Sequence, residues 1–585
     1  MENAEKLEHL RHSCAHLLAA AVMELYPDAK RTIGPSIENG FYYDFDFSDT
    51  KVSEADFEKI EQKMHELVKN WKGFERIESN KDEAIEFFKD NTYKKELIEE
   101  FSAEEQTLTL YKSGDYTDLC RGGHSPHPNN DLKHFKLLSV AGAYWRGSEK
   151  NKMLTRIYGT CFPKKTDLDA YLVQQEEAKK RDHKKLGAEL DLFVFSDLVG
   201  KGLPLWTAKG ATVRRILERF IVDEEIKRGY SHVYTPDIAN LSLYKTSGHY
   251  PYYKDTMYAP ITIEEEEYML RPMTCPHHFE LYKSQPHSYK ELPIRYAEIA
   301  KLYRFEKSGE LSGLMRVRSF CLADAHIIAT KSQATDEING VLDLIDFAAE
   351  SFGLKQRVNY RYRLSLGDRT DDKKYYKDDK SWEQAEKVLR NVLISRKAEY
   401  YEAENEAAFY GPKIDVQMKN IHGKEETAFT VQYDFVMPKR FKLEYTTDTG
   451  AKEEPIVIHR SSIGAIERTI AFLIEFYGGA FPLWLAPTQV AVIPIAERHN
   501  EAALTALEAL KQAGIRAEAD TKGEPMGAKI RSHTLQKIPY MAIIGDTETA
   551  SNTVSVRTRC GEELKDISIS EFITKLTDEI ERKTT

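Results

Sequence analysis

The sequence predicts a multidomain protein of mixed α+β and α/β class, and three observations predict it. At 585 residues the chain is too long for one hydrophobic core, which indicates about three or four domains. Its 41% hydrophobic and 30% charged residues are ordinary for a globular protein. The texture also changes along the chain, from short alternating strands such as FYYDFDF (41–47) to strands that alternate with helices near the end.

Four zones of different texture divide the chain. A zone of helices and short strands is followed by one charged helix, then by a long zone rich in aromatic and arginine residues, and finally by alternating strands and helices. The charged helix carries alternating acidic and basic runs, which are typical of a solvated connector. The zones span residues 1–165, 166–188, 189–485 and 486–585.

Composition and charge exclude several classes of protein. No apolar run approaches the ~18 residues that a membrane span needs, and the polar start lacks the basic head of a secretory signal. We therefore expect a cytoplasmic protein with no membrane partner. The net charge of −11 disfavours sequence-independent polyanion binding, but local basic patches remain compatible with RNA. Six cysteines predict no disulfide framework, so each is a core residue, a nucleophile or a metal ligand.

The long central zone gathers arginines around one loop. In YRFEKSGELSGLMRVRSF (303–320), Arg304 and Glu306 end one strand-like run, and Arg316 begins another that ends in Phe320. Two strands joined by this Gly/Ser loop would aim Arg304 and Arg316 at one spot, where guanidinium groups can hold phosphate oxygens bidentately. Phe320 offers a stacking face for a base. An exposed hairpin with surface salt bridges is the alternative, and the chain has no G-x-x-x-x-G-K-[ST] phosphate loop.

A second feature of this zone is VIHRSSIGAIERTIAFLIEFYGG (457–479). It begins as a strand with His459 near its end and continues as a helix with one apolar stripe of isoleucines. Arg468 lies on this helix, where it could reach a ligand held by the arginine loop. A lone helical arginine is more often a surface residue.

Three stretches carry residue types that bind metals. Cys275 in RPMTCPHHFELY is a buried apolar residue, a reactive thiol or part of a metal site. His12 and His16 lie four apart on one side of a predicted helix, and Cys120 and His124 are also four apart, in a glycine-rich loop. Two His, a Cys and a further His look like a tetrahedral metal set, while core packing is the alternative for each pair.

The final zone reads as an α/β unit. VAVIPI (490–495) is a predicted buried strand, and Asn500 caps an apolar-periodic helix that Gly514 closes. IRAEAD, a helix through Arg531, YMAIIG and VSVRTR follow. Strands that alternate with helices predict a largely parallel sheet.

These stretches together resemble a known family. YRFE with RVRSF, the strand and helix that end in GAIER, and the helix before Pro236 in VYTPDI resemble the three signature motifs of class II aminoacyl-tRNA synthetases. TCPHH, FYGPKID, LMRVRSF, DAHI, IHRSSIGAIER, HSCAHLL and DLCRGGH are similar to threonyl-tRNA synthetases, almost from end to end. The resemblance implies an N-terminal α+β editing domain, an antiparallel-sheet catalytic core flanked by helices, and a C-terminal α/β anticodon-binding domain.

The resemblance implies a threonine–tRNA ligase that forms threonyl-adenylate from L-threonine and ATP, with Mg²⁺ on the phosphates, and then charges tRNA(Thr). It implies one Zn²⁺ on Cys275, His326 and His459, with an open position that an amine and a β-hydroxyl chelate together. Valine has no hydroxyl, and an apolar pocket alone would separate it from threonine by only ~1–3 kcal/mol. The other implied catalytic and substrate-binding residues are Arg304, Arg316, Arg468, His249, Lys413, Met273, Asp324, Phe320, Tyr410, Gln432 and Glu306.

Individual roles follow from the same resemblance. Arg304 holds the α-phosphate, Arg316 the γ-phosphate, and Arg468 stacks on adenine opposite Phe320. His249 matches a histidine implied in deprotonating the attacking tRNA hydroxyl, a role that the ordinary histidine pKa suits.

Three positions depart from the family. Leu322 and Thr427 stand where it usually carries glutamines near the substrate, and His277 stands where glycine is more common. Two alternatives stay open: a synthetase for another small amino acid, and a paralogue that binds RNA without charging it, which the departures at Leu322 and Thr427 keep open.

The resemblance also implies a second site that hydrolyses serine mischarged onto threonine tRNA. Serine keeps the amine and hydroxyl and lacks one methyl, so binding separates it from threonine by only ~1–3 kcal/mol and a second site is needed. The implied editing residues, with no obligatory metal, are His12, His16, Lys94, Asp118, Cys120 and His124.

The resemblance places tRNA recognition in the final zone and a homodimer contact around Pro236. The chain starts shortly before His12, so we expect the small extra domain with which bacterial relatives begin to be absent. Arg and Glu side chains can read the splayed bases of a single-stranded loop. The implied anticodon-binding residues are Arg531, Glu548 and Arg557, within a positive face made by Lys522, Lys529, Arg531 and Lys537.

Overall fold

The protein, analysed as a computed structural model, is described over residues 2–103 and 108–583. It divides into two compact units, Met1–Glu176 and Glu177–Thr585. Each unit buries its own hydrophobic core. Within the described residues no helix combines the length and the apolar character that a membrane crossing requires.

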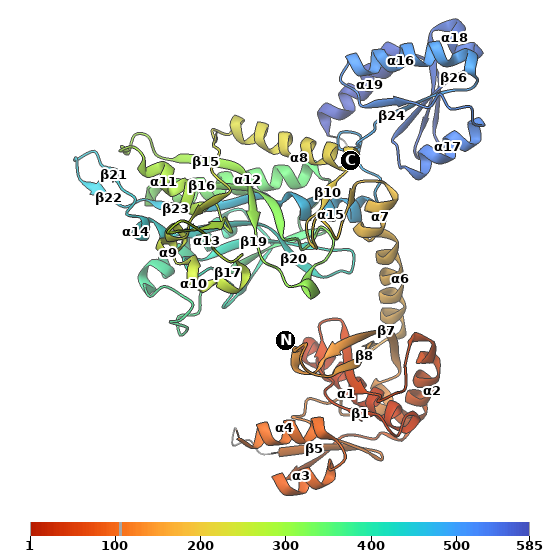
Figure 1. Cartoon of the computed structure of the whole chain (residues 1–585), viewed down its shortest axis with the longest axis vertical. Coiled ribbons are helices and arrows are strands. Elements are labelled where there is room, and N and C mark those ends of the chain that lie inside the picture. The colour runs from red at the N-terminus through yellow and green to blue at the C-terminus, as the bar shows by residue number, and fades with distance from the viewer. Residues whose placement is uncertain (1, 104–107, 584–585) are drawn as a thin grey trace. The chain divides into compact units, whose positions relative to one another are not determined.

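The first unit packs a long helix against a sheet. α1 (Glu2–Leu25) lies on a five-stranded sheet of order β1-β3-β8-β7, in which β2 also pairs with β3 (Figure 1). The predicted strand at 41–47 is confirmed, although nearly every residue of it is buried because α1 covers the sheet. The strands are β1 (Lys30–Arg31), β2 (Ser36–Ile37), β3 (Gly40–Asp46), β7 (His134–Tyr144) and β8 (Met153–Phe162).

A smaller antiparallel sheet of order β4-β5-β6 completes this unit. Two helices pack on each other, and the second contacts both β5 and β1, so the small sheet is tied to the larger one. The elements are β4 (Glu75–Ser79), α3 (Lys81–Phe87), α4 (Thr92–Ala103), β5 (Leu108–Ser113) and β6 (Tyr116–Leu119).

An eight-stranded sheet of order β11-β15-β16-β23-β20-β19-β17-β18 forms the centre of the second unit. Its long inner pairs are antiparallel, as predicted, whereas the outer pairs β11–β15 and β17–β18 are parallel. The strands are β11 (Ser231–His232), β15 (Ile294–Tyr303), β16 (Ser319–Ala329), β17 (Tyr360–Ser365), β18 (Tyr400–Ala403), β19 (Lys413–Lys419), β20 (Glu425–Asp434) and β23 (Ile456–Ala465).

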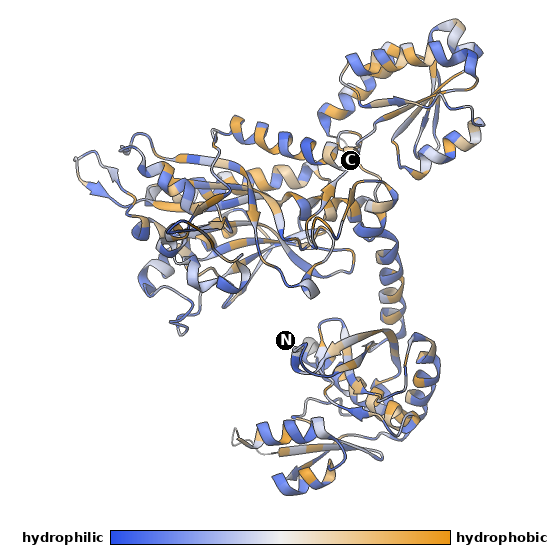
Figure 2. Ribbon diagram, viewed as in Figure 1, coloured by the Kyte–Doolittle hydropathy of each residue, from blue (hydrophilic) through white to orange (hydrophobic). Residues whose placement is uncertain are grey.

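Amphipathic helices cover this sheet. Apolar and polar residues alternate along α8 in Figure 2, as packing against a core requires. The predicted isoleucine stripe that follows β23 is buried, and its helix α15 contacts β16 and β23. The principal helices are α8 (Ala208–Lys227), α9 (Leu241–Ser247), α11 (Cys275–Lys283), α12 (Ala334–Ser351), α13 (Asp379–Ser395) and α15 (Ile466–Tyr477).

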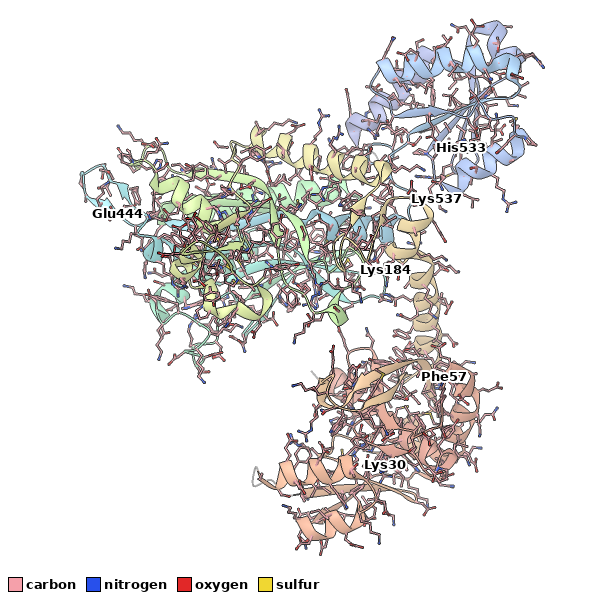
Figure 3. All side chains as sticks on the ribbon, viewed as in Figure 1. Lys30, Phe57, Lys184, Glu444, His533 and Lys537 are labelled. Carbon is pink, nitrogen blue, oxygen red and sulfur yellow. The ribbon has the colours of Figure 1, made fainter. Side chains whose placement is uncertain are left out.

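The single connector helix predicted over 166–188 is wrong, because two helices occupy it. α6 (Lys165–Arg181) ends before Asp182, whose side chain accepts a 2.7 Å hydrogen bond from the backbone N–H of Lys184 (Figure 3) and so starts α7 (His183–Glu189). His183 and Leu186 of α7 are buried against α15, so one side of the second half of the connector packs on the core, while Lys184 and Lys185 stay exposed.

The last zone of the sequence, residues 486–585, forms a mixed sheet of order β25-β24-β26-β27-β28. The prediction of a largely parallel sheet is wrong for half of it: β24 is parallel to both neighbours, but β27 is antiparallel to both of its own. A parallel crossover needs about a dozen residues or more, and the connection before β27 contains only the 6-residue helix α18. The strands are β24 (Val490–Pro494), β25 (Ala517–Ala519), β26 (Tyr540–Ile544), β27 (Thr553–Thr558) and β28 (Glu563–Ser568).

Helices pack on this sheet as expected, with one local difference. α16 starts at Asn500 itself after a short turn, and the capping position is His499, whose Nδ1 accepts a 3.2 Å hydrogen bond from the N–H of Ala496. Gly514 does follow the helix, with a φ of +78° that favours glycine. The helices are α16 (Asn500–Gln512), α17 (Met526–Leu535), α18 (Asp546–Ser551) and α19 (Ile569–Arg582).

Candidate active site and a second polar cavity

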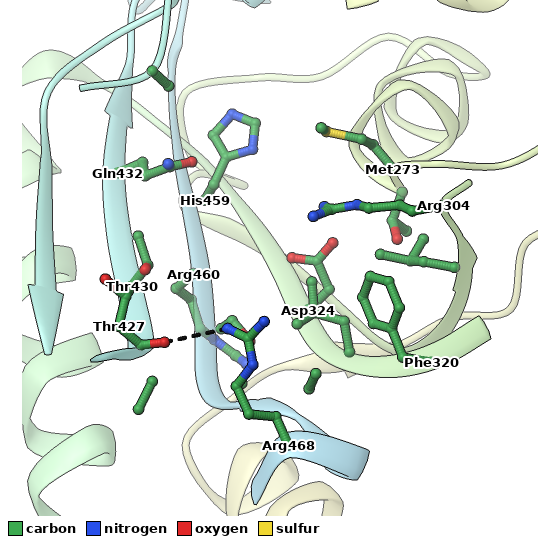
Figure 4. A pocket seen from close by; sticks show the side chains of 18 of the residues that line it. Met273, Arg304, Phe320, Asp324, Thr427, Thr430, Gln432, His459, Arg460 and Arg468 are labelled. Carbon is green, nitrogen blue, oxygen red and sulfur yellow. Dashed lines mark hydrogen bonds between the residues drawn. The ribbon is translucent and has the colours of Figure 1, made fainter. Parts of the chain in front are cut away.

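A cavity of about 450 Å³ lies against the inner strands of the eight-stranded sheet. Residues of β16, β19, β20 and β23, and of the loop between β15 and β16, form its walls (Figure 4). Every residue predicted for the catalytic core lines this cavity except His249. The lining residues from that set are Met273, Cys275, Arg304, Glu306, Arg316, Phe320, Asp324, His326, Tyr410, Lys413, Gln432, His459 and Arg468.

Cys275, His326 and His459 meet on one wall of this cavity. The register of β16 and β23 sets His326 directly opposite His459, with ring centres 4.6 Å apart. Cys275 is the first residue of α11, which contacts β16. The ligand atoms of these three buried residues all lie within 4.8 Å of one another. One thiol and two imidazoles at this spacing fit a tetrahedral Zn²⁺ that keeps one position open.

Hydrogen bonds behind each ring determine which nitrogen faces the cavity. Nε2 of His459 lies 2.7 Å from a carboxylate oxygen of Asp434, which leaves Nδ1 as the free nitrogen. Nδ1 of His326 lies 2.8 Å from Nδ1 of His278, which leaves Nε2. Asp434 had no sequence signal, because strand pairing brings it here from a distant segment, whereas His278 lies in the TCPHH stretch that resembles the family.

Burial determines the protonation states of this set. It lowers the pKa of His326 well below its ordinary value, helped by the neighbouring His459, so the ring is neutral as a metal ligand must be. Burial, followed by the nearby Asp324 and Asp434, raises the pKa of the Cys275 thiol well above its ordinary range. Cys275 therefore needs a bound cation to become a thiolate.

The arginines occupy the loop that joins two antiparallel strands, as predicted. Tyr303 pairs with Ser319, so the two ends of the loop are adjacent. Arg304 lies with its guanidinium 5.2 Å from the ring centre of Phe320. Arg316 Nε lies 2.9 Å from a carboxylate oxygen of Glu306.

Arg468 faces the cavity from α15. It donates from Nη1 to the carbonyl oxygen of Thr427 at 3.4 Å, drawn as a dashed line in Figure 4, and from Nε to the carbonyl oxygen of Met315 at 3.3 Å. It therefore spans the gap between β20 and the arginine loop.

Two of the three departures from the family differ in their surroundings. Leu322 and Thr427 both line the cavity. The hydroxyl of Thr427 accepts a 2.7 Å hydrogen bond from the side-chain amide of Gln417, its pairing partner on β19. The Thr427 hydroxyl is therefore held by an amide of the neighbouring strand, whereas Leu322 places only apolar atoms at its own position.

His249 is fully buried beside Phe409 and Tyr410, and its Nδ1 lies 2.7 Å from the hydroxyl of Ser247. Burial, followed by the charge of His459, lowers its pKa to about 3. The expectation that its pKa suits proton abstraction near neutral pH is therefore wrong for this conformation, because desolvation makes the imidazole a weak base.

A second cavity, of about 670 Å³, lies in the first unit. His12, His16, Lys94, Asp118 and Cys120 line it, so it collects the predicted editing residues from α1, α4 and β6. The remaining member, His124, stacks on His12 with ring centres 4.8 Å apart, and its Nε2 lies 3.4 Å from the Cys120 sulfur. The ligand atoms of the three histidines and the cysteine lie within 4.8 Å of one another, which also suits a metal.

Asp118 is the electrostatic centre of this second cavity. Lys94 Nζ lies 2.8 Å from its carboxylate and Arg31 Nε lies 3.3 Å away, while Tyr43 and Tyr116 donate at 2.5 and 2.9 Å. Burial opposes ionisation, but the Lys94 and Arg31 charges hold the pKa of Asp118 well below its usual range. Sequence reasoning missed Arg31, Tyr43 and Tyr116, because three different strands supply them.

The predicted anticodon residues separate into two places. Glu548 on α18 accepts a 2.7 Å hydrogen bond from Ser555, two residues before Arg557 on the same strand. Arg531 is exposed on α17, a different element.

The predicted positive face loses one member. Lys529 is 3% exposed and donates to the carbonyl oxygens of Asp520 at 2.8 Å and Pro494 at 3.4 Å, so its placement on that face is wrong. The reason is helix geometry: Lys529 lies one turn before the inward-facing His533 (Figure 3), whose Nε2 lies 3.1 Å from Asp520.

Three families of known domains match the chain. They are described as the tRNA synthetase class II core domain (G, H, P, S and T), the anticodon binding domain, and the threonyl and alanyl tRNA synthetase second additional domain. They match residues 258–477, 489–579 and 108–158 respectively.

Curated relatives and solved structures agree with these matches. Threonine–tRNA ligases of Geobacillus sp. (strain WCH70) and Staphylococcus carnosus are each 50% identical over 581 residues, which is 99% of this chain and 89% of each relative. A solved RNA-binding domain of a Cryptosporidium parvum threonyl-tRNA synthetase is 34% identical with a TM-score of 0.65, and covers 68% of this chain and 98% of its own. A prolyl-tRNA synthetase of the same organism, 17% identical with a TM-score of 0.52 over 68% of this chain and 75% of its own, shares the fold.

Proposed function

Because the chain belongs to the threonine–tRNA ligase family of class II synthetases, we propose that its core performs both steps of threonine charging. The carboxylate of L-threonine attacks the α-phosphorus of ATP and releases pyrophosphate, which gives threonyl-adenylate. The 3′-terminal adenosine hydroxyl of tRNA(Thr) then takes the threonyl group and releases AMP. The observation that carries this proposal is the meeting of Cys275, His326 and His459 on the wall of a cavity that Arg304, Arg316 and Arg468 also line.

The amino-acid side of the cavity selects threonine. Cys275, His326 and His459 would hold Zn²⁺, which supplies a Lewis acid with room for the amine and β-hydroxyl of the substrate. Asp324, whose carboxyl is buried on the same wall, accepts from the substrate hydroxyl. Valine offers no hydroxyl to these groups and leaves them unpaired, so it is rejected more strongly than by shape alone.

The nucleotide side binds and orients ATP. Arg304 holds the α-phosphate and Arg316 the γ-phosphate, and Mg²⁺ would accompany the phosphates. To bind the γ-phosphate, the Arg316 side chain gives up its hydrogen bond to Glu306. Adenine would lie between Phe320 and Arg468, which are both labelled in the cavity of Figure 4. Arginine charge fixed at the α-phosphate stabilises the negative charge that develops there during attack.

Further cavity residues orient the threonine carboxylate. The Tyr410 hydroxyl donates to the side-chain oxygen of Gln432 at 2.8 Å, so the amide N–H₂ of this cavity residue is the group left to donate to the substrate. Lys413, held 3.1 Å from the buried Asp415, and Met273 complete this side. His249 remains the candidate for the transfer step. In this proposal the tRNA end makes the surroundings of His249 more polar, which raises the pKa that burial lowers.

Pyrophosphate exchange with metal analysis tests the activation step. We expect one equivalent of zinc and threonine-dependent exchange in the wild type, loss of both in Cys275→Ala, and retention of both in the matched control Cys560→Ala, an exposed thiol. Full zinc and full exchange in Cys275→Ala would contradict the site. Equal exchange with valine or serine would favour a synthetase for another amino acid, and no exchange with any amino acid would favour an RNA-binding paralogue.

The second cavity hydrolyses seryl-tRNA(Thr) in this proposal. His12 and Cys120, whose nitrogen and sulfur lie 3.0 Å apart, orient the attacking water, and His16 and His124 enclose it. Lys94, held by Asp118, faces the ester carbonyl. Lys94→Ala should abolish deacylation of seryl-tRNA(Thr) and leave threonine activation unchanged. Equal deacylation by this variant and the wild type would contradict the assignment.

Partners and boundaries complete the proposal. We assign editing to 1–165, catalysis to 189–485 and anticodon binding to 486–585, with 166–188 as the connection. Arg531, Glu548 and Arg557 contact the anticodon loop of tRNA(Thr). A homodimer forms around Pro236, a placement supported by the exposed Tyr234 and Ile238 beside it. The substrates ATP and tRNA favour a cytoplasmic location.

A further inference from the structure

A buried chain of hydrogen bonds runs away from the candidate metal ligand His326. Its Nδ1 lies 2.8 Å from Nδ1 of His278 on α11, and the Nε2 of His278 lies 3.3 Å from Glu298 on β15. Glu298 is held in turn by the Thr235 hydroxyl at 2.7 Å and by Arg271 Nη2 at 3.0 Å. His278, Glu298, His326 and Arg271 are each at most 3% exposed, so water does not compete for these bonds.

The direction of these bonds follows from the last acceptor. An ionised carboxylate only accepts, so Nε2 of His278 carries the hydrogen that Glu298 receives. Burial opposes ionisation of Glu298, but bonds from His278, Thr235 and Arg271 lower its pKa to about 2, so it is a carboxylate at neutral pH. When His326 binds an ion through Nε2, the hydrogen of its ring lies on Nδ1 and is donated to Nδ1 of His278, which is the acceptor. The lone pair of His326 is thereby left on Nε2.

We propose that His278, which Glu298 holds in place, is a positioning residue of the metal centre and fixes His326 in the tautomer that presents Nε2 to the ion. The inference rests on the proposed metal set and goes beyond it, because neither residue touches metal or substrate. His459 obtains the equivalent bond directly from Asp434. His326 obtains it only through His278, which is the one hydrogen-bond partner of its ring among the described residues.

The residue next to His278 provides a control substitution. His277 lies beside His278 on α11 and is 9% exposed, but neither of its ring nitrogens has a hydrogen-bond partner among the described residues. A substitution at His277 therefore disturbs the same helix and the same packing without touching the orientation of His326.

Two amide substitutions at His278 test whether the hydrogen-bond acceptor must lie at the position of Nδ1. The side-chain oxygen of His278→Asn falls near the position of Nδ1 and can accept from His326, whereas that of His278→Gln falls near Nε2 and cannot. Metal-depleted full-length protein is titrated with Zn²⁺ against a chromophoric chelator, and the absorption spectrum of the Co²⁺-loaded protein is recorded. Loss of an outer partner typically costs ~10–100-fold in metal affinity.

We expect that loss in His278→Gln, with a changed Co²⁺ spectrum, and near wild-type values in His278→Asn and in the His277→Gln control. Wild-type affinity and spectrum in His278→Gln would overturn the proposal, as would equal losses in all three variants, since these would indicate general core damage. If His278→Gln does not fold, His278→Leu, which also lacks the acceptor, replaces it with the same expected loss. A wild-type protein that binds no more zinc than Cys275→Ala would overturn the metal centre itself, and the positioning role with it.

Discussion

Replacing Asp118 by asparagine should loosen the whole second cavity. The carboxylate is 1% exposed, pairs with Lys94 and Arg31, and accepts from Tyr43 and Tyr116. Asparagine keeps the shape and one acceptor, but it leaves two buried cations facing a neutral amide. Removing one partner of a buried ion pair costs about 3–5 kcal/mol, and we expect the lower end of that range because the amide oxygen still accepts.

The same substitution should make the stability of the first unit depend less on pH in the acid range. Asp118 has a folded-state pKa below its unfolded value of about 3.9, because Lys94 and Arg31 outweigh the opposing effect of burial. A group of this kind contributes stability above its unfolded pKa and loses that contribution as pH falls through the folded value. The wild type therefore loses the Asp118 contribution progressively below about pH 4, whereas Asp118→Asn has none to lose.

Hydrogen exchange on the full-length protein measures both effects, because it reports local opening of α1, β3 and β6 without requiring two-state unfolding of the whole chain. Asp115→Asn is the matched control: this carboxylate is exposed three residues away, and its loss should change the opening free energy by less than about 0.5 kcal/mol. If Asp118→Asn lowers the opening free energy at pH 7 by less than about 1 kcal/mol, the ion-pair reasoning is refuted.

Three further changes have defined outcomes. Gly464→Ala combines a φ of +65° with a Cβ placed 2.4 Å from the carbonyl oxygen of Ala428, so we expect about 1–3 kcal/mol of destabilisation by thermal unfolding and loss of pyrophosphate exchange. Gln417→Leu removes the 2.7 Å bond to Thr427, worth about 1 kcal/mol, and should raise the KM for ATP about fivefold in exchange kinetics. Lys529→Met leaves two buried carbonyl groups unpaired and should destabilise the C-terminal sheet by about 1–3 kcal/mol, measured by exchange of β24 amides.

Matched substitutions serve as controls for these changes. Gly523→Ala places its Cβ in open space and should leave stability and exchange unaltered, in contrast to Gly464→Ala. Lys522→Met removes an exposed charge and should lower only the salt-dependent part of tRNA binding, leaving the exchange of β24 amides at its wild-type rate. Indistinguishable results for the paired glycine variants, or for the paired lysine variants, would contradict the packing argument in each case.

Local order was predictable from the sequence because its causes are local. A period of 3.6 residues put His12 and His16 on one side of α1 and identified the buried stripe of α15. Turn and glycine residues predicted the loop between β15 and β16. The same reasoning was wrong at 166–188, because one side chain, Asp182, offers the backbone a cap that periodicity does not register.

By itself, then, the sequence determined the helices, the strands, the arginine loop and, through its resemblance, the three candidate metal ligands. Only the tertiary structure decided how they meet. Strand register set His326 opposite His459, since a shift of one residue would turn either ring to the other face of the sheet. Packing of α11 and β15 supplied His278 and Glu298, and three strands supplied the partners of Asp118. Register and packing depend on pairing energies between distant segments, which no local pattern contains.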